Sequence, residues 1–296
     1  MTAIEVDGLR KSYGDVAAVR GVSFSVREGE VFGLLGPNGA GKTTIVEILE
    51  GYRRHDAGNV SVLGVDPEHG GRALRGRIGL VLQEAEVPPL LSVRELIDLY
   101  RGMYPSPRPA AELLELVGLA EKADARVRTL SGGQKRRLDV ALGLVGDPEL
   151  IFLDEPTTGF DPTARRNAWE LIRVMRGLGK TIVLTTHYMD EAQHLADRIC
   201  VIAAGLVVAE GTPDTLRRDS ARHTVIRFAA PGGVDLGSLP LSASQRDGTV
   251  VIETSTPTRS VHAVTAWALD RNLELDGFEV SRPSLEDVYL ELTDLE

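Results

Sequence analysis

Four short stretches of the chain are mostly apolar and are not broken by a regular alternation of polar positions. They span residues 31–35, 78–82, 150–153 and 181–185. A strand with one solvent-exposed face alternates apolar and polar residues, whereas an unbroken apolar run of this length is typical of a strand buried on both faces. The pattern therefore predicts an α/β fold in which a mainly parallel sheet is covered by helices.

Residues that could bind a ligand or take part in catalysis follow each of these four runs. They are Gly36 and Lys42 after the first run, Gln83 after the second, Asp154 and Glu155 after the third, and His187 after the fourth. In open α/β sheets, ligands bind in the crevice outside the carboxyl ends of the strands. All four predicted strands therefore direct candidate residues toward one site.

Between residues 84 and 130 the pattern becomes helical. Ser92 to Glu95 has the form of a capping box before LIDLYRGMY, and AELLELVGL follows a proline-rich break at Pro105 to Pro109 as a second amphipathic helix. We therefore predict a helical subdomain at about residues 84–130, inserted into an α/β domain that spans residues 1–218.

After about Asp219 the pattern changes again. The segments TVIRF, GTVVIET and LELDGFEV have the composition of strands, and a Pro-Gly-Gly loop occupies residues 231–233. Val261, Val264 and Trp267 recur at helical spacing, and Ser284 to Asp287 begins a further helix. This predicts a small α+β domain at residues 219–296.

The composition and charge exclude several classes of protein. The chain has 296 residues, of which 43% are hydrophobic, and its net charge of -10 argues against a general nucleic-acid-binding protein. The first residues contain no apolar stretch of signal-peptide length, and the longest nearly apolar run, Ile199–Ala209, is far shorter than the roughly 20 residues that span a bilayer. We expect a cytoplasmic protein whose single cysteine, Cys200, is a buried thiol.

Residues 36–43, GPNGAGKT, fit the phosphate-binding pattern G-x-x-x-x-G-K-S/T between a predicted strand and the helix KTTIVEILE. The glycines allow backbone amides to face a phosphate, and the helix N-terminus adds a partial positive charge. Lys42 would reach the β- and γ-phosphates, and Thr43 would bind Mg²⁺. We predict a nucleotide site formed by Gly36, Pro37, Asn38, Gly39, Ala40, Gly41, Lys42, Thr43 and Thr44.

Two adjacent carboxylates end the third apolar run. Asp154 would hold Mg²⁺, and Glu155 would polarise an attacking water as a general base. The alternative is a pair of solvated acids in a turn. We favour the functional interpretation, because an apolar run rarely ends in two carboxylates unless a cation lies nearby.

Three further residues have both a functional and an ordinary interpretation. His187 would bind the γ-phosphate and fix the attacking water, and Gln83 would contact Mg²⁺ or water; the alternatives are a structural histidine and a surface polar residue. Their common position at strand ends favours the functional roles. Tyr13 would stack on adenine, or it is an ordinary exposed tyrosine in a strand, and its local sequence leaves both open.

A second glycine-rich turn, LSGGQ at residues 130–134, precedes another helix. We call residues 36–43 the phosphate loop and residues 130–134 the signature turn. The amides of the signature turn and the helix behind it would suit an anion, although the phosphate loop is already complete. We interpret the basic cluster Lys135–Arg137 that follows as mainly a solvated helix face.

Together these motifs closely resemble those of the ATP-binding subunits of ABC transporters. They occur in the order of that family, over roughly residues 2–218, and LSGGQ followed closely by LDEP is highly specific. The motifs are Tyr13, GPNGAGKT, Gln83, LSGGQ, LIFLDEP at 150–156, GFDP at 159–162 and His187. Phe160 stands where leucine is usual in the family, but Asp161 is retained. The resemblance implies an ABC ATPase core of the P-loop NTPase class that hydrolyses ATP with Mg²⁺.

The resemblance also implies roles for individual residues. Glu155, His187 and Gln83 correspond to the catalytic residues of the family, and Thr43, Gln83 and Asp154 to its metal ligands. In this family two subunits pair head to tail, so each ATP lies between the phosphate loop of one and the signature turn of the other. The residues contributed across the pair would be Ser131, Gly132, Gly133, Gln134 and Asp161.

A separate integral membrane permease would dock on residues 84–130, which would place the chain, most simply as a homodimer, on the inner face of the cell membrane. The segment SRPSLEDVYLELT is similar to the tails of drug-exporter subunits of the daunorubicin-resistance type. The alternative function is a soluble ABC-type ATPase that acts on ribosomes, DNA or protein assemblies. Such chains usually carry two ATPase cores or a long coiled coil, neither of which is present in this sequence.

Overall fold

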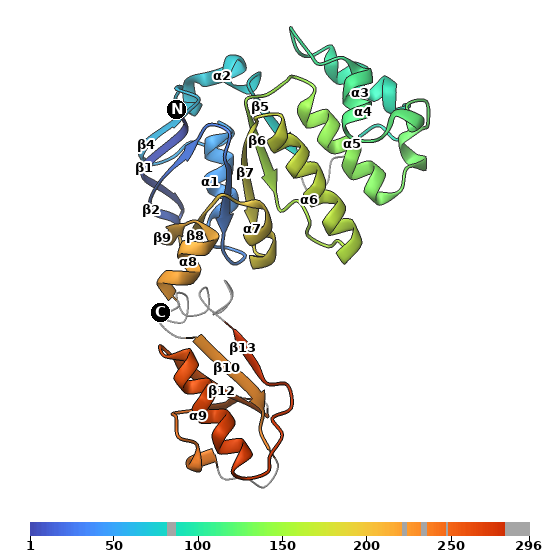
Figure 1. Cartoon of the computed structure of the whole chain (residues 1–296). Coiled ribbons are helices and arrows are strands. Elements are labelled where there is room, and N and C mark those ends of the chain that lie inside the picture. Colours follow the sequence, from blue (N-terminus) through green and yellow to red (C-terminus); the bar gives the residue numbers. More distant parts are fainter. Residues whose placement is uncertain (82–86, 221–223, 232–235, 247, 282–296) are drawn as a thin grey trace. The chain divides into compact units, whose positions relative to one another are not determined.

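The computed structural model describes residues 1–81, 87–220, 224–231, 236–246 and 248–281, and the chain divides into two compact units, Met1–Thr212 and Pro213–Glu296 (Figure 1). Sequence analysis places the boundary after residue 218, which falls within helix α8 (Pro213–Ser220). Gln83, the predicted helix start at Ser284 and part of the Pro-Gly-Gly loop lie outside the described residues.

A six-stranded sheet forms the centre of the first unit. Its strand order is β5-β6-β7-β3-β8-β9, and all neighbouring pairs are parallel except the β8–β9 hairpin. The strands are β5 (Ile78–Val81), β6 (Leu150–Asp154), β7 (Thr181–Thr186), β3 (Val31–Leu35), β8 (Arg198–Ala203) and β9 (Leu206–Gly211). The four unbroken apolar runs are therefore four neighbouring parallel strands, which confirms the predicted α/β class.

Alternate residues of these strands enter two different hydrophobic cores. In β6, Leu150 and Phe152 face one core, whereas Ile151 and Leu153 face the other. Both faces of each central strand are thus buried, which explains why these runs contain so few polar residues.

The first core lies between the six-stranded sheet and a second sheet of three strands, which the apolar pattern did not predict. The second sheet is antiparallel with the order β2-β1-β4 and is formed by β1 (Thr2–Tyr13), β2 (Val16–Arg27) and β4 (Ala57–Val62). Helix α1 (Lys42–Leu49) contributes to this core, and α2 (Pro67–Arg75) follows β4. Cys200 is fully buried here, as expected, and burial raises the pKa of its thiol.

The second core lies on the opposite face and is covered by helices. They are α3 (Val93–Arg101), α4 (Ala110–Leu116), α5 (Gly132–Leu144), α6 (Pro162–Gly177) and α7 (Met189–Leu195), with short 3-10 turns at Ala120–Lys122 and Val127–Thr129. The predicted capping box before α3 is present, since Ser92 Oγ accepts from the Glu95 N–H at 3.2 Å and Glu95 Oε2 accepts from the Ser92 N–H at 2.8 Å.

The solvated basic face predicted at the start of α5 is wrong for its central residue. Lys135 is exposed, but Arg136 is only 6% exposed, and Arg137 donates to the carbonyl of Val117 at 3.4 Å. Helix α5 packs against β5, α3, α4 and α6, so more than one of its faces is covered. Burial lowers the pKa of Arg136, whereas the nearby Asp139 and Glu191 raise it.

The described part of the second unit is an antiparallel sheet with one long helix. The sheet has the order β11-β12-β10-β13, and α9 (Pro257–Leu269) contributes Val264 and Trp267 to its core. Its strands are β10 (Thr224–Ala229), β11 (Ser244–Arg246), β12 (Thr249–Thr254) and β13 (Glu279–Ser281), with a 3-10 turn at Leu236–Ser238. Among the described residues, no helix of either unit combines the length and apolarity needed to cross a bilayer.

The strand predicted at LELDGFEV is mostly wrong. Only its last two residues belong to a strand, β13 (Glu279–Ser281), because Asp276 and Gly277 form a turn in the middle of the segment. Gly277 has a φ of 65°, a left-handed conformation that interrupts an extended strand.

Candidate functional site

The phosphate loop connects the buried strand β3 to helix α1 and is clamped by its neighbours in the fold. The Gly36 N–H donates to the Thr186 carbonyl at 3.2 Å, and a Cβ at Gly36 would lie 2.2 Å from the Ile202 carbonyl oxygen. Gly41 has a φ of 101°, and a Cβ there would lie 2.4 Å from the Ala18 carbonyl oxygen. Both glycines are therefore required by the close approach of backbone within this chain.

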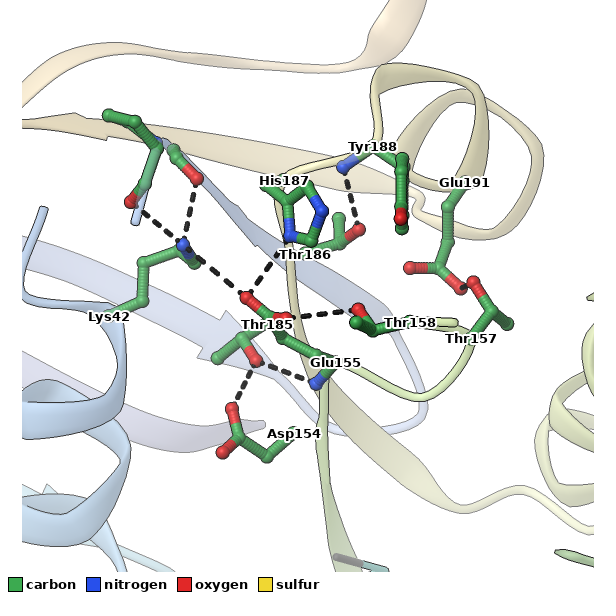
Figure 2. A network of polar contacts seen from close by, with 12 residues as sticks. Lys42, Asp154, Glu155, Thr157, Thr158, Thr185, Thr186, His187, Tyr188 and Glu191 are labelled. Atoms are coloured by element: carbon green, nitrogen blue, oxygen red, sulfur yellow. Dashed lines mark hydrogen bonds and ion pairs between the residues drawn. The ribbon is translucent and has the colours of Figure 1, made fainter. Parts of the chain in front are cut away.

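The Lys42 ammonium lies inside the phosphate loop. Its Nζ donates to the carbonyls of Gly36 at 2.7 Å and Pro37 at 3.0 Å, and it lies 3.9 Å from Glu155 Oε1 (Figure 2). Burial lowers the pKa of Lys42, whereas the charges of Glu155 and Asp154 raise it. The ammonium is thus held where an anion bound by the loop would meet it.

The remaining predicted loop residues lie on either side of Lys42 in the sequence. Pro37, Asn38 and Gly39 are exposed, and Ala40 is buried; Thr43 and Thr44 begin α1, with Thr43 exposed and Thr44 half-buried. The positive end of α1 therefore opens at the loop, as an anion site requires.

Asp154 and Glu155 are joined to the neighbouring strand by Thr185, which sequence analysis did not identify. Asp154 and Thr185 are opposite each other in the β6–β7 register. Thr185 Oγ1 donates to Asp154 Oδ1 at 2.5 Å and accepts from the Glu155 N–H at 3.0 Å (Figure 2). The only sequence signal for this role is a hydroxyl within an apolar run.

The Glu155 carboxylate lies between Lys42, His187 and Thr158. His187 Nδ1 lies 3.2 Å from Glu155 Oε1, and Thr158 Oγ1 donates to Glu155 Oε2 at 2.9 Å. Glu155 itself has a φ of 43°, in the left-handed region that a non-glycine residue seldom adopts. The structure therefore brings together Lys42, Asp154, Glu155 and His187, whereas Gln83 lies outside the described residues.

Tyr13 ends strand β1, opposite Val16 of β2. Two residues after Val16 on β2, the carbonyl of Ala18 lies against Gly41. The end of β1 that carries Tyr13 is therefore near the phosphate loop. The ring is 39% exposed, and the Arg53 guanidinium lies 5.1 Å from its centroid. Both interpretations of Tyr13, the adenine platform and the ordinary strand tyrosine, are compatible with this position.

The signature turn is not part of this cluster within one chain. Figure 1 shows α5 beside α3 and α4, separated from α1 by the strands. Ser131 caps α5, because its Oγ accepts from the Gln134 N–H at 3.3 Å while Gln134 Oε1 accepts from the Ser131 N–H at 3.0 Å. Gly132 and Gly133 are exposed, and a Cβ at either would meet no atom of the described residues within 4 Å.

Asp161 also has a structural role within its own chain. Its Oδ1 accepts from the N–H groups of Thr163 at 2.8 Å and Ala164 at 2.9 Å, which makes it the N-cap of α6. It is exposed.

Comparisons with known proteins cover both units. The ABC transporter family model matches residues 19–158, and a model described as the C-terminal domain of ABC transporter domain-containing protein-like sequences matches residues 224–284. The chain is 40% identical to the daunorubicin resistance ATP-binding protein DrrA3 of Streptomyces coeruleorubidus, over 99% of this chain and 96% of that protein. It is 44% identical to the Nod factor export ATP-binding protein I of Rhizobium sp. (strain N33), over 98% and 97%.

A solved structure shares the fold of the first unit. It is the dimeric ATP-binding cassette MJ0796 in a post-hydrolysis state, bound to ADP and phosphate. The match has a TM-score of 0.62 at 26% identity and covers 71% of this chain and 98% of that one.

Proposed function

Because the chain belongs to the family of ATP-binding, ATP-hydrolysing subunits of ABC transporters, we propose that it powers export through a separate membrane-spanning subunit, using the cluster around Glu155. One observation carries the chemical part of this proposal: four side chains from three segments of the chain meet at the carboxyl edge of the parallel strands (Figure 2). They are Lys42, Asp154, Glu155 and His187.

Each of these side chains has a role that follows from its position. Lys42 neutralises the phosphates that the loop binds. Glu155 accepts a proton from the attacking water, and His187 orients that water and the γ-phosphate, since its ring lies 3.2 Å from the Glu155 carboxylate. The Thr158 hydroxyl holds the other oxygen of Glu155 at 2.9 Å and so fixes the direction of the carboxylate.

The residues present fit a magnesium ion. Hydroxyl and carboxylate oxygens are the ligands that Mg²⁺ prefers, and Asp154 receives a hydrogen bond from Thr185 on Oδ1. Thr43, Asp154 and Gln83 would hold the ion, which neutralises charge on the β- and γ-phosphates when bound.

The test of the general base is Glu155→Gln. We expect ATP binding to persist and kcat to fall at least about 100-fold, because a positioned base contributes on that order. The matched control is Glu149→Gln, directly before β6, where the carboxylate pairs with Arg77 at 2.6 Å on the surface. A Glu155→Gln enzyme that hydrolyses ATP at the normal rate would overturn the assignment.

We propose further that a second copy completes the site with its signature turn and Asp161. The support is that no contact with the described part of the chain requires glycine at positions 132 and 133, together with the dimeric state of MJ0796. In such a symmetric, head-to-tail pair both ATP sites are equivalent. Closure then depends on ATP binding the closed pair more tightly than the open one.

The membrane partner is proposed to dock on the helical subdomain, and the chain is thereby held on the cytoplasmic face of the cell membrane. Large apolar side chains are exposed in this part of the chain, at Leu90 (63%), Leu99 (50%) and Met103 (69%). The relative named for Nod factor export supports the export direction, and the relative named for daunorubicin resistance is compatible with it.

Copurification from detergent-solubilised native membranes tests the partner. We expect a multi-span protein to copurify with the wild-type chain and to be lost with Leu99→Asp and Met103→Asp. It should be kept with Leu269→Asp, a control in the second unit at a side chain that is 72% exposed. Recovery only with ribosomes, DNA or a soluble assembly would contradict the transport function and leave the ATPase intact.

A further inference from the structure

A fully buried carboxylate lies next to the catalytic cluster without belonging to it. Glu191, on α7, is 0% exposed, and none of the roles proposed above uses it. Burying a carboxylate is costly unless hydrogen bonds compensate, so its contacts show what the fold uses it for.

One oxygen of Glu191 joins two other elements. Glu191 Oε1 accepts from the Thr157 hydroxyl at 2.8 Å (Figure 2). The same oxygen accepts from the Trp169 indole N–H at 3.3 Å. Thr157 lies in the loop that follows β6, and Trp169 lies on α6. Glu191 therefore links the segment after β6, the helix that begins at Asp161, and the helix that follows His187.

The contact with Thr157 lies two residues after Glu155 in the same turn. Thr157 is 0% exposed, and the next residue, Thr158, donates to the Glu155 carboxylate. Glu155 adopts the left-handed conformation with φ of 43°, which is unfavourable for a side chain of this type and persists only where neighbours hold it. The Thr157–Glu191 bond is a tether placed at this strained turn.

A second set of contacts connects α7 to His187. The Tyr188 ring packs against the His187 ring in a tilted arrangement with centroids 4.1 Å apart, and the Arg165 guanidinium lies 4.6 Å from the Tyr188 centroid. Arg165 also pairs with Asp190 at 3.1 Å, and Trp169 stacks on His194 at 4.7 Å. Arg165 and Trp169 are four residues apart on α6, so one face of α6 holds the start of α7.

The pKa of the Glu191 carboxyl is raised above its usual value. Burial raises the pKa of the Glu191 carboxyl, whereas hydrogen bonds from Thr186, Thr157 and Trp169 lower it. The buried Arg136 on α5 lies close enough for the charge of Glu191 to raise the pKa of its guanidinium.

We propose that Glu191 is a positioning residue, which holds Glu155 and His187 in the register that ATP hydrolysis requires. It does so by tying the loop after β6 and the helix after β7 to each other and to α6. The proposal rests on the catalytic roles assigned above to Glu155 and His187, and it concerns the rate of the chemical step rather than the binding of ATP.

The cleanest test removes the tether without changing any charge. Thr157→Val replaces the donor hydroxyl by a methyl group of similar volume. We expect kcat to fall about 10-fold, since small misplacements of catalytic groups are costly, while the KM and Kd for ATP change less than about twofold. Thr157→Ser keeps the donor and should recover most of the lost rate.

Two substitutions at Glu191 separate hydrogen bonding from packing. Glu191→Gln retains an acceptor for Thr157 and Trp169, and we expect it to keep much more activity than Glu191→Leu, which fills similar space without an acceptor. The double variant Thr157→Val with Glu191→Leu should have nearly the kcat of Glu191→Leu alone, because both changes break the same bond. Glu170→Gln on the neighbouring helix α6 is the control, since the exposed Glu170 carboxylate pairs with Arg173 and not with Thr157.

Three results would overturn the proposal. One is unchanged kcat in Thr157→Val, another is equal kcat in the Gln and Leu variants at Glu191, and the third is a loss of ATP affinity that matches the loss of rate. Thermal unfolding identifies any variant that fails to fold, and Thr157→Val then decides alone. Failure of the general-base assignment is a separate result, because it would appear as normal hydrolysis by Glu155→Gln.

Discussion

The phosphate loop and the signature turn are both glycine-rich segments that open a helix, but they need glycine for different reasons. In the phosphate loop, backbone of the same chain comes within 2.2 Å of a Cβ at Gly36 and 2.4 Å of one at Gly41. In the signature turn, a Cβ at Gly132 or Gly133 would meet nothing within 4 Å. The need for glycine in the phosphate loop thus comes from the fold of the chain itself. No contact within the described chain explains the glycines of the signature turn.

This difference indicates how the two segments act. A loop whose glycines are required by its own fold is preformed and binds its ligand in a fixed shape. A turn whose glycines are open to solvent keeps a clear path to its backbone amides, and such a path is useful only to something that arrives from outside, as in the proposed head-to-tail pair.

Gly41→Ala should show the largest effect. The substitution requires a φ near 101° from an alanine and places its methyl group against the Ala18 carbonyl. We expect a loss of about 2–4 kcal/mol of stability and no detectable ATP binding, because strain and overpacking act at the same position. Thermal unfolding and binding of a fluorescent ATP analogue measure both; near wild-type values in both would show that the loop relaxes freely.

Gly133→Ala should separate folding from function. Position 133 is helical and open, so alanine should stabilise the chain by about 0.5 kcal/mol through the unfolded state. ATP binding to the monomer should be unchanged, whereas ATPase activity and the ATP-dependent dimer should fall at least about 10-fold if a partner's phosphate approaches this amide. Full activity in an enzyme of raised stability would remove the reason for assigning the turn to a second ATP.

The helices behind the two turns should differ in how stability depends on pH. Asp139 on α5 is half-buried, and this partial burial raises its pKa from 3.8 to about 6; Glu50 directly after α1 is buried, which raises its pKa from 4.5 to about 8. At a pH between the unfolded and the folded pKa of either group, the unfolded chain has released the proton that the folded chain still holds. The free energy of unfolding therefore falls as pH rises through these two ranges, about pH 4–6 for Asp139 and about pH 4.5–8 for Glu50.

Asp139→Asn should remove the part of this fall between about pH 4 and 6, an effect on the order of 1 kcal/mol. The fall between pH 6 and 8 should remain and should disappear in Glu50→Gln. Denaturant titrations of the nucleotide-free chain across pH 4–8 measure these intervals. A wild-type stability that rises from pH 5 to pH 8 would contradict the sign for both groups.

Much of the fold could be read from the order of residues. The four unbroken apolar runs are the strands β3, β5, β6 and β7, because a strand buried on both faces must be apolar throughout. The Ser92 capping box and the helix α9 are also as predicted, since both depend on neighbours within a few positions. The segment LELDGFEV was misread because a turn at Gly277 divides a composition that is otherwise typical of a strand.

The candidate site shows the same division. The sequence alone placed Lys42, Asp154, Glu155 and His187 at strand ends, because the parallel arrangement brings strand ends to one edge. It did not identify Thr185, Thr157 or Glu191. No pattern along the chain marks a side chain whose importance comes only from its contact with another strand or helix. Arg136 was misplaced for the same reason: its burial depends on the helices packed around α5.

The sequence by itself therefore determined the four central strands β3, β5, β6 and β7, the phosphate-binding motif and the family, all of which depend on local order and spacing. Tertiary structure decided the strand register that pairs Asp154 with Thr185, the left-handed conformation of Glu155 and the burial of Glu191 beneath it. These features arise from contacts between residues more than thirty positions apart, such as the bond from Thr157 to Glu191. Their energy comes from packing and hydrogen bonding that exist only once the chain is folded.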